Sequence, residues 1–258
     1  MVAPDGTRIA FDRRGAGPVL VLVDGALSER RTGPMRPLAE HLAPWFTVVT
    51  YDRRGRGQST DGTGPVRAYT VGHEVGDLRR LLEVVGARGS GAAVHGASTG
   101  ALLALHAAAA GLPVRSVSLF EPPPGAGARL GGGFARTLTA LLEAGRRAEV
   151  VRTFQRAAGV PEALVAAGAA GFAASAQTLV YDCALTCALT RAVAARVGVP
   201  ALVVRATATA TATGGRWPPG TRDVVTALPR GEQVVLPRVW HGVPDADLAA
   251  VLAAFHRR

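Results

Sequence analysis

The feature that most constrains the fold is a repeated alternation of short apolar runs with amphipathic segments. The run Val19–Val23 contains no polar residue, which is typical of a strand buried on both faces of a parallel sheet. Further strands are predicted at residues 46–51, 91–94, 114–120, 201–204 and 233–236, and helices at residues 35–42, 73–85, 99–110, 221–228 and 246–256. This order predicts an α/β fold, a mostly parallel sheet with helices on both faces.

The segment that precedes Val19–Val23 has the pattern of a second strand. Residues 7–12 alternate in polarity, and residues 13–18 contain two glycines and a proline before the apolar run Val19–Val23. Alternation followed by a glycine-rich turn is typical of a β-hairpin. We therefore expect residues 7–12 to pair with Val19–Val23.

The alternation stops after three consecutive prolines. From residue 125 to residue 197 only helical patterns occur, at residues 134–142, 149–158 and 161–190. The sequence therefore predicts an α/β core made of residues 1–124 and 198–258, interrupted by a helical cap or lid of residues 125–197.

Composition narrows the class of protein. The chain has 258 residues, of which 48% are hydrophobic and 19% charged, and this balance excludes intrinsic disorder. Two cysteines cannot form a disulfide framework, so we expect Cys183 and Cys187 to be small buried thiols. No apolar run reaches about 18 residues, and the first residues do not resemble a signal peptide. We expect a cytoplasmic protein without membrane contact, present as a monomer or homodimer.

The net charge of +10 raises the question of an anionic partner. Every basic residue is arginine, and the arginines occur singly or in pairs rather than in long runs. We therefore expect no nucleic-acid partner and place most arginines on solvent-facing surfaces. Arg30, Arg31 and Arg205 are expected on loops near the mouth of the pocket, where they could attract an anionic substrate.

One motif carries chemistry. Residues 96–100 read Gly-Ala-Ser-Thr-Gly, which matches G-x-S-x-G between a predicted strand and a predicted helix. A nucleophilic serine in this motif sits on a strained turn, so its neighbours must be small. The helix that follows directs its N-terminus toward the developing oxyanion. Ser98 is the predicted nucleophile.

Two further segments resemble a known family together with this turn. Asp24-Gly25 follows a buried strand, and residues 52–59, Asp-Arg-Arg-Gly-Arg-Gly-Gln-Ser, follow the next one. With the serine turn, they resemble the α/β-hydrolase superfamily, in a form typical of actinobacterial serine hydrolases with a helical cap. The resemblance implies a serine, an acid and a histidine in that chain order, a backbone oxyanion hole, and neither cofactor nor metal.

The remaining site residues are placed by this resemblance. His241 follows the last predicted strand and precedes the final helix, which is the position of the catalytic histidine. The backbone N–H groups of Thr99 and Ala26 are expected to form the oxyanion hole. A small-molecule substrate pocket is expected to include Asp24, Leu27, Tyr181 and Trp240, although Asp24 could instead be a local structural acceptor.

The acid of the triad is left open. The loop after residues 201–204 contains no carboxylate, although the family usually supplies one there. Glu121 ends an adjacent predicted strand and could orient His241. Asp223 and Asp182 are weaker candidates, and the acid could be missing.

Three functions therefore compete. The first is a serine hydrolase that cleaves a carboxylic ester, thioester or lactone of a small apolar molecule. The second is a related enzyme of natural-product biosynthesis that catalyses a non-hydrolytic cyclisation, rearrangement or acyl transfer. The third is a ligand-binding protein with a decayed triad.

Overall fold

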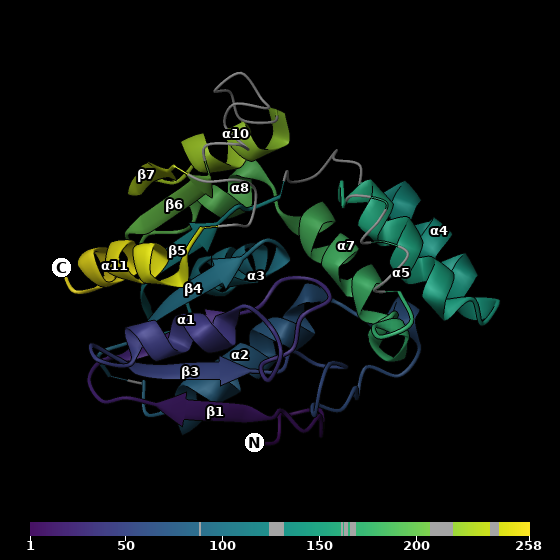
Figure 1. Ribbon diagram of the computed structural model, residues 1–258, viewed down its shortest axis with the longest axis horizontal. Coiled ribbons are helices and arrows are strands. Elements are labelled where there is room, and N and C mark those ends of the chain that lie inside the picture. The colour runs from purple at the N-terminus through teal and green to yellow at the C-terminus, as the bar shows by residue number, and fades with distance from the viewer. Residues whose placement is uncertain are drawn as a thin grey trace.

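The computed structural model describes residues 1–87, 89–123, 132–160, 162, 165, 169–206, 219–237 and 243–258. In these residues the chain forms a seven-stranded sheet in the order β1-β3-β2-β4-β5-β6-β7 (Figure 1). Every neighbouring pair is parallel except β1 with β3. The predicted α/β class is confirmed. The strands are β1 (Phe11–Arg14), β2 (Val19–Val23), β3 (Thr47–Tyr51), β4 (Ala92–Ala97), β5 (Val114–Phe120), β6 (Ala201–Ala206) and β7 (Gly231–Leu236).

The predicted N-terminal hairpin is wrong. β1 pairs antiparallel with β3, and Val2 forms a separate bridge with Arg8. The reason is that both edges of β2 are occupied, because β2 pairs in parallel with β3 on one side and β4 on the other. β1 therefore extends the sheet at its edge.

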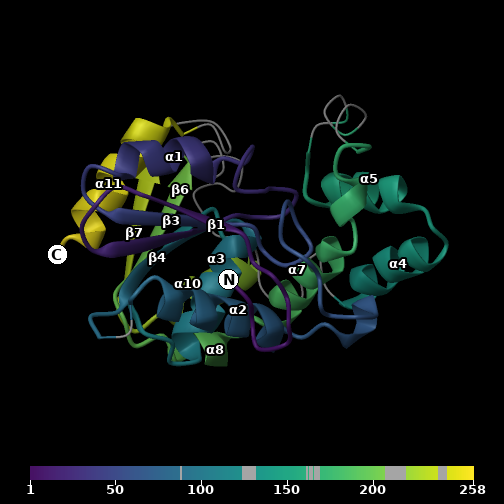
Figure 2. The same cartoon turned by 90° about the horizontal axis from the view of Figure 1, so that it is seen from below.

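Helices cover both faces of the sheet (Figure 2). On one face lie α1 (Met35–Leu42) and α11 (Asp245–His256). On the other lie α2 (Val71–Val84), α3 (Thr99–Ala109), α8 (Arg191–Ala195) and α10 (Pro219–Thr226). Along β2, Leu20 and Leu22 pack toward the α1 and α11 face, whereas Val21 and Val23 pack toward the opposite face. This two-sided burial explains why the strand is apolar throughout.

Between β5 and β6 the chain leaves the sheet. There it forms α4 (Gly132–Glu143), α5 (Arg147–Ala157) and α7 (Thr178–Ala188), which stand to one side of the sheet in Figure 1. We refer to these three helices as the insertion. They share a core that includes Leu138, Val150, Phe154 and Leu179. The boundaries of the cap, residues 125–197, stay a prediction.

The continuous helix predicted over residues 161–190 is not present as such. Residues 169–177 form turns and the short 3₁₀ helix η2 (Ala173–Ser175), and α7 begins only at Thr178. After α7 the chain forms α8, a short helix that the sequence pattern does not predict. The side chain of Thr190 caps it by accepting a hydrogen bond from the backbone N–H of Val193.

Across the described part of the chain, none of the helices has the length and apolar character needed to cross a membrane.

Candidate active site

Ser98 occupies the turn between β4 and α3 in a backbone conformation that side chains rarely adopt, with φ 51° and ψ −125°. A Cβ on Gly96 would lie 2.3 Å from the carbonyl oxygen of Gly100, and a Cβ on Gly100 would lie 2.3 Å from that of Val23. Both glycines are therefore required for steric reasons. The backbone N–H of Ser98 donates to Phe120 at 2.9 Å, which ties the turn to the end of β5.

The loop that follows β2 packs against this turn. A Cβ on Gly25 would lie 3.0 Å from the Cβ of Ser98, so only glycine allows the loop to come this close. Leu27 in the same loop also has a positive φ, of 56°. The loop therefore brings Ala26 beside Ser98, and both residues border one cavity.

That cavity has a volume of about 300 Å³. Much of its wall is apolar and comes from α1, α11, β5 and the insertion, through residues such as Met35, Leu38, Leu248, Phe120 and Phe154. Leu27 borders it as well. Besides Ser98, the polar residues in its wall are Ser28, His95, Gln155 and Asp245. Its size and polarity suit a small, mainly apolar ligand.

Two residues predicted around the pocket have other contacts. Asp24 is 2% exposed, does not border the cavity, and accepts from the backbone of Met35 at the start of α1. Burial raises the pKa of Asp24 to about 7, against the attraction of Arg56 and Arg53. Among the described residues, Asp24 thus contacts the start of α1 and lies outside the cavity wall.

Tyr181 also lies outside the cavity wall. Its ring stacks on Tyr69 at 4.0 Å between centroids, and its hydroxyl donates to Asp61 at 2.8 Å. Tyr181 therefore holds α7 against the core, which differs from the pocket role predicted for it.

Glu121 follows β5, where it adopts a positive φ of 46°. Its Oε1 accepts from the backbone N–H of Ala206 at 2.6 Å, and its own N–H donates to Val204 at 3.0 Å. Glu121 thus joins the ends of β5 and β6. Three described residues other than glycine have a positive φ, and all three, Leu27, Ser98 and Glu121, follow strands at this end of the sheet. Such strain is frequent at functional sites.

The other predicted members of the site cannot be placed. His241 and Trp240 lie outside the described residues. Asp223 belongs to α10, but its side chain is outside the description. The predictions for these residues stay predictions.

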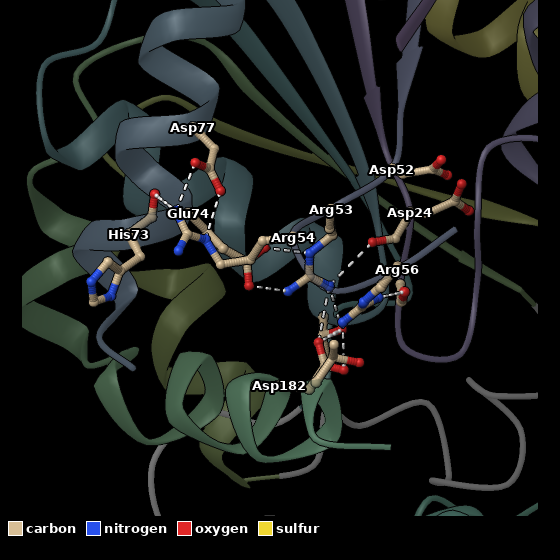
Figure 3. Close-up of polar contacts among 12 residues, drawn as sticks. Asp24, Asp52, Arg53, Arg54, Arg56, His73, Glu74, Asp77 and Asp182 are labelled. Atoms are coloured by element: carbon tan, nitrogen blue, oxygen red, sulfur yellow. Dashed lines mark hydrogen bonds and ion pairs between the residues drawn. The ribbon is translucent and has the colours of Figure 1, made fainter. Parts of the chain in front are cut away.

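A cluster of buried charges joins the loop after β3 to α2 and α7 (Figure 3). Arg53 donates to Glu74 of α2 at 2.6 Å and to Asp182 of α7 at 2.9 Å, and Arg56 donates to Asp182 at 2.8 Å. Thr99 donates to Asp182 at 2.7 Å. The six members, which we call the ion-pair cluster, are Arg53, Arg54, Arg56, Glu74, Asp77 and Asp182.

All members of the ion-pair cluster are at most 3% exposed. Burial opposes the charge of Asp182, but Arg56 and Arg53 outweigh it and lower the pKa of Asp182. Burial raises the pKa of Asp77 to about 6, although Arg54 counteracts it through a hydrogen bond. Because both oxygens of Asp182 accept bonds from the core, this residue anchors the insertion; its role as the acid of a triad stays a prediction.

The arginines differ in part from the sequence prediction. Arg79 and Arg80 are exposed as expected, but Arg53, Arg54 and Arg56 are buried. Arg205 lies in β6 at 1% exposure rather than on a loop at the pocket mouth. Arg30 pairs with Asp12 and Asp52, and Arg30 and Arg31 border a separate hollow of about 480 Å³ that shares no described residue with the cavity at Ser98.

The described residues contain no group of three His, Cys, Asp or Glu that could hold a metal ion. Cys183 and Cys187 are free thiols, and Cys183 is buried in the core of the insertion. Burial raises the pKa of both thiols, which keeps them protonated.

A mostly parallel sheet with a strained serine turn between strand and helix defines the class of α/β hydrolases. No protein-family model matches the chain. A solved α/β hydrolase from Sphaerobacter thermophilus DSM 20745 is 38% identical, and the match covers 99% of both chains with a TM-score of 0.82. The chain belongs to the α/β-hydrolase family.

Two curated relatives match over shorter segments. The uncharacterized hydrolase YraK of Bacillus subtilis is 37% identical over 100 residues, 39% of this chain and 35% of that protein. A pimeloyl-acyl-carrier-protein methyl ester esterase of Stenotrophomonas maltophilia is 34% identical over 110 residues, 43% of this chain and 38% of that protein. The matches thus span less than half of these relatives.

Proposed function

We propose that this protein is a serine hydrolase that cleaves a carboxylic ester, thioester or lactone of a small, mainly apolar molecule. The observation that carries the proposal is the strained Ser98 at the wall of a cavity of about 300 Å³. The curated relatives named as a hydrolase and a methyl ester esterase support an ester as the substrate.

In the proposed reaction Ser98 attacks the carbonyl carbon, and His241 accepts the serine proton. The backbone N–H groups of Thr99 and Ala26 stabilise the oxyanion of the tetrahedral intermediate. His241 then protonates the leaving group, and an acyl-enzyme remains on Ser98. Water, activated by His241, hydrolyses this ester and restores the enzyme.

We assign Glu121 as the residue that orients His241. Its place at the joined ends of β5 and β6 supports this, because that edge of the sheet carries the serine turn. Replacing the acid of a triad lowers the rate by about 10⁴-fold. Glu121→Gln should therefore lower kcat by about 10²- to 10⁴-fold, whereas Asp223→Asn should leave it within about twofold. The reverse outcome would transfer the role to Asp223.

The proposal is tested with p-nitrophenyl esters and purified protein. Ser98→Ala should abolish cleavage, and Ser90→Ala, a change at an exposed serine in the loop before β4, should retain it. A fluorophosphonate probe should label the wild-type protein at Ser98, as mapped by mass spectrometry. Cleavage that survives in Ser98→Ala would overturn the nucleophile.

The natural reaction is distinguished with ¹⁸O water. Label in the acid product supports hydrolysis, whereas turnover without label supports the non-hydrolytic reaction of natural-product biosynthesis. A protein that neither reacts with the probe nor turns over any ester is a ligand-binding protein.

A further inference from the structure

Four neutral polar side chains form a continuous chain beneath the cavity. His95 Nδ1 lies 2.9 Å from Ser118 Oγ, and Ser118 Oγ lies 2.8 Å from His256 Nε2. His256 Nδ1 lies 2.8 Å from Ser116 Oγ. We call these residues of β4, β5 and α11 the histidine–serine chain. Burial lowers the pKa of both histidines to about 3, so both rings are neutral at pH 7.

One end of the histidine–serine chain reaches the cavity at Ser98. His95 is fully buried and borders the cavity, and its Nε2 has no hydrogen-bond partner among the described residues. His95 lies three residues before Ser98, on the same face of β4 as Ala97, which also borders the cavity. A buried polar atom without a hydrogen-bond partner destabilises the empty cavity, so a ligand that supplies the partner gains affinity.

A second residue that borders the cavity also has a buried polar atom without a hydrogen-bond partner. Gln155 of α5 is 6% exposed, and its Oε1 is buried without a hydrogen-bond partner among the described residues. It borders the cavity from the insertion, whereas His95 borders it from the sheet. Two residues that line a mainly apolar cavity and carry unpartnered polar atoms indicate a ligand with polar atoms of its own.

We propose that the cavity binds an acyl group that carries an oxygen function, a keto group rather than a hydroxyl group, and that His95 Nε2 donates a hydrogen bond to the keto oxygen. This inference rests on the proposed hydrolase function and specifies its substrate class. His95 is then a substrate-binding residue that determines specificity.

The hydrogen bonds of the histidine–serine chain can run in two directions. If the Ser118 hydroxyl donates to His95 Nδ1, then Nε2 carries the proton and donates to a keto oxygen. If Ser118 donates to His256 Nε2 instead, then His95 Nδ1 carries the proton and Nε2 accepts from a hydroxyl group. Both arrangements are neutral, and exchange between them requires that one proton leave His95 Nε2 while another reaches Ser116 Oγ. A keto group selects the first arrangement.

The test compares matched p-nitrophenyl esters: pentanoate with 4-oxopentanoate, and hexanoate with 5-oxohexanoate. The uncatalysed hydrolysis rates correct for intrinsic reactivity. Wild-type protein should prefer at least one oxo ester by about tenfold in kcat/KM, the effect of one hydrogen bond. His95→Phe, which keeps a planar ring without the nitrogens, should lose this preference.

Ser90→Ala is the control. Ser90 is exposed in the loop before β4 and belongs neither to the histidine–serine chain nor to the cavity wall, so its loss should leave the preference within about twofold. The absence of an oxo preference in the wild-type protein at both chain lengths overturns the inference without any variant. Retention of the preference in folded His95→Phe also overturns it.

A binding experiment separates this inference from the proposed function. Hexane-2,5-dione and hexan-2-one cannot be cleaved, and calorimetry should find tighter binding of the dione. The dione should also shift the ¹⁵N resonance of His95 Nε2. If no ester is cleaved but both effects occur, the hydrolase proposal fails and the oxygen site stands. If esters are cleaved without oxo preference, only the oxygen site fails.

Discussion

The buried polar groups on the two faces of the sheet differ in how they are paired. Toward α2 and α3, the ion-pair cluster holds full charges that satisfy one another, and Asp182 alone accepts from three core residues. Toward α11, the histidine–serine chain is neutral and ends in an atom without a protein partner. A charged group cannot be left unpaired in the core, but a neutral one can at moderate cost.

This difference separates structure from ligand binding. The ion-pair cluster joins the loop after β3, α2 and α7, and every member has its partner inside the protein. It fixes the insertion to the core. The histidine–serine chain leaves one position for a ligand, so its unsatisfied nitrogen serves recognition. Changes to the two clusters should therefore differ in the size of their effect on stability.

The largest effect is expected for Asp182→Ala. The substitution leaves Arg53 and Arg56 buried without this carboxylate, and breaking a buried pair from one side costs about 3 to 5 kcal/mol. Urea denaturation followed by circular dichroism measures the change in the free energy of unfolding. A loss below about 1 kcal/mol would mean that water or a shift of α7 compensates the arginines, and the anchoring role would be wrong.

The sequence predicted the parts of the fold that depend on local pattern. Val19–Val23 could only be a strand buried on both faces, and the spacing of Gly96, Ser98 and Gly100 required a tight turn between strand and helix. The pairing of β1 was missed because it depends on which edges of distant strands remain open. Local alternation contains no information about that competition.

The site was predicted only in part for a similar reason. Arginine is usually exposed, so the burial of Arg53 and Arg54 was not expected. A signal existed in α2, where Glu74 and Asp77 share the helical spacing of the buried Leu78 and Leu81. For His95, the sequence does not show which face of β4 the side chain lies on or which residue it forms a hydrogen bond with.

The next effect concerns the pH dependence caused by Asp24. Its pKa is raised by burial to about 7 in the folded state, whereas an unfolded aspartate titrates near 3.8. The folded state therefore binds more protons between these values, and stability falls as pH rises through this range. Relative to Asp24→Asn, the wild-type protein should lose on the order of 2 to 3 kcal/mol between pH 4.5 and pH 8. Denaturation of both proteins across this range measures the difference, and parallel curves would contradict it.

The histidine–serine chain should give a slope of the opposite sign. Burial lowers the pKa of His256 to about 3, against 6.5 in the unfolded chain. The unfolded state binds more protons between these values, so this stability is fully present above pH 6.5 and is lost as pH falls toward 3. Between pH 7.5 and pH 4.5, the free energy of unfolding of His256→Gln should therefore fall by on the order of 2 kcal/mol less than that of the wild-type protein.

Asp24→Asn is the counterpart to this experiment, because it should steepen the same acid-side slope that His256→Gln flattens. If both variants change the slope in one direction, the assignment of opposite proton balances to Asp24 and His256 is wrong. Thermal unfolding monitored at several pH values would detect the difference without extrapolation to zero denaturant.

The smallest effect is expected for the exposed ion pair between Glu143 and Arg67, which also joins the insertion to the core. Glu143 of the insertion accepts from Arg67 of the core at 2.7 Å, a distance similar to those in the ion-pair cluster, but the two side chains are 54% and 70% exposed. Water solvates both groups in the folded and unfolded states, so Glu143→Ala should cost about 0 to 1 kcal/mol and the cost should vanish in high salt. A loss equal to that of Asp182→Ala would show that bridging the insertion and the core matters more than burial. We expect the two ion pairs, which have similar distances, to differ several-fold in their effect on the free energy of unfolding. That result would show that the insertion is held to the core mainly because Arg53 and Arg56 are buried.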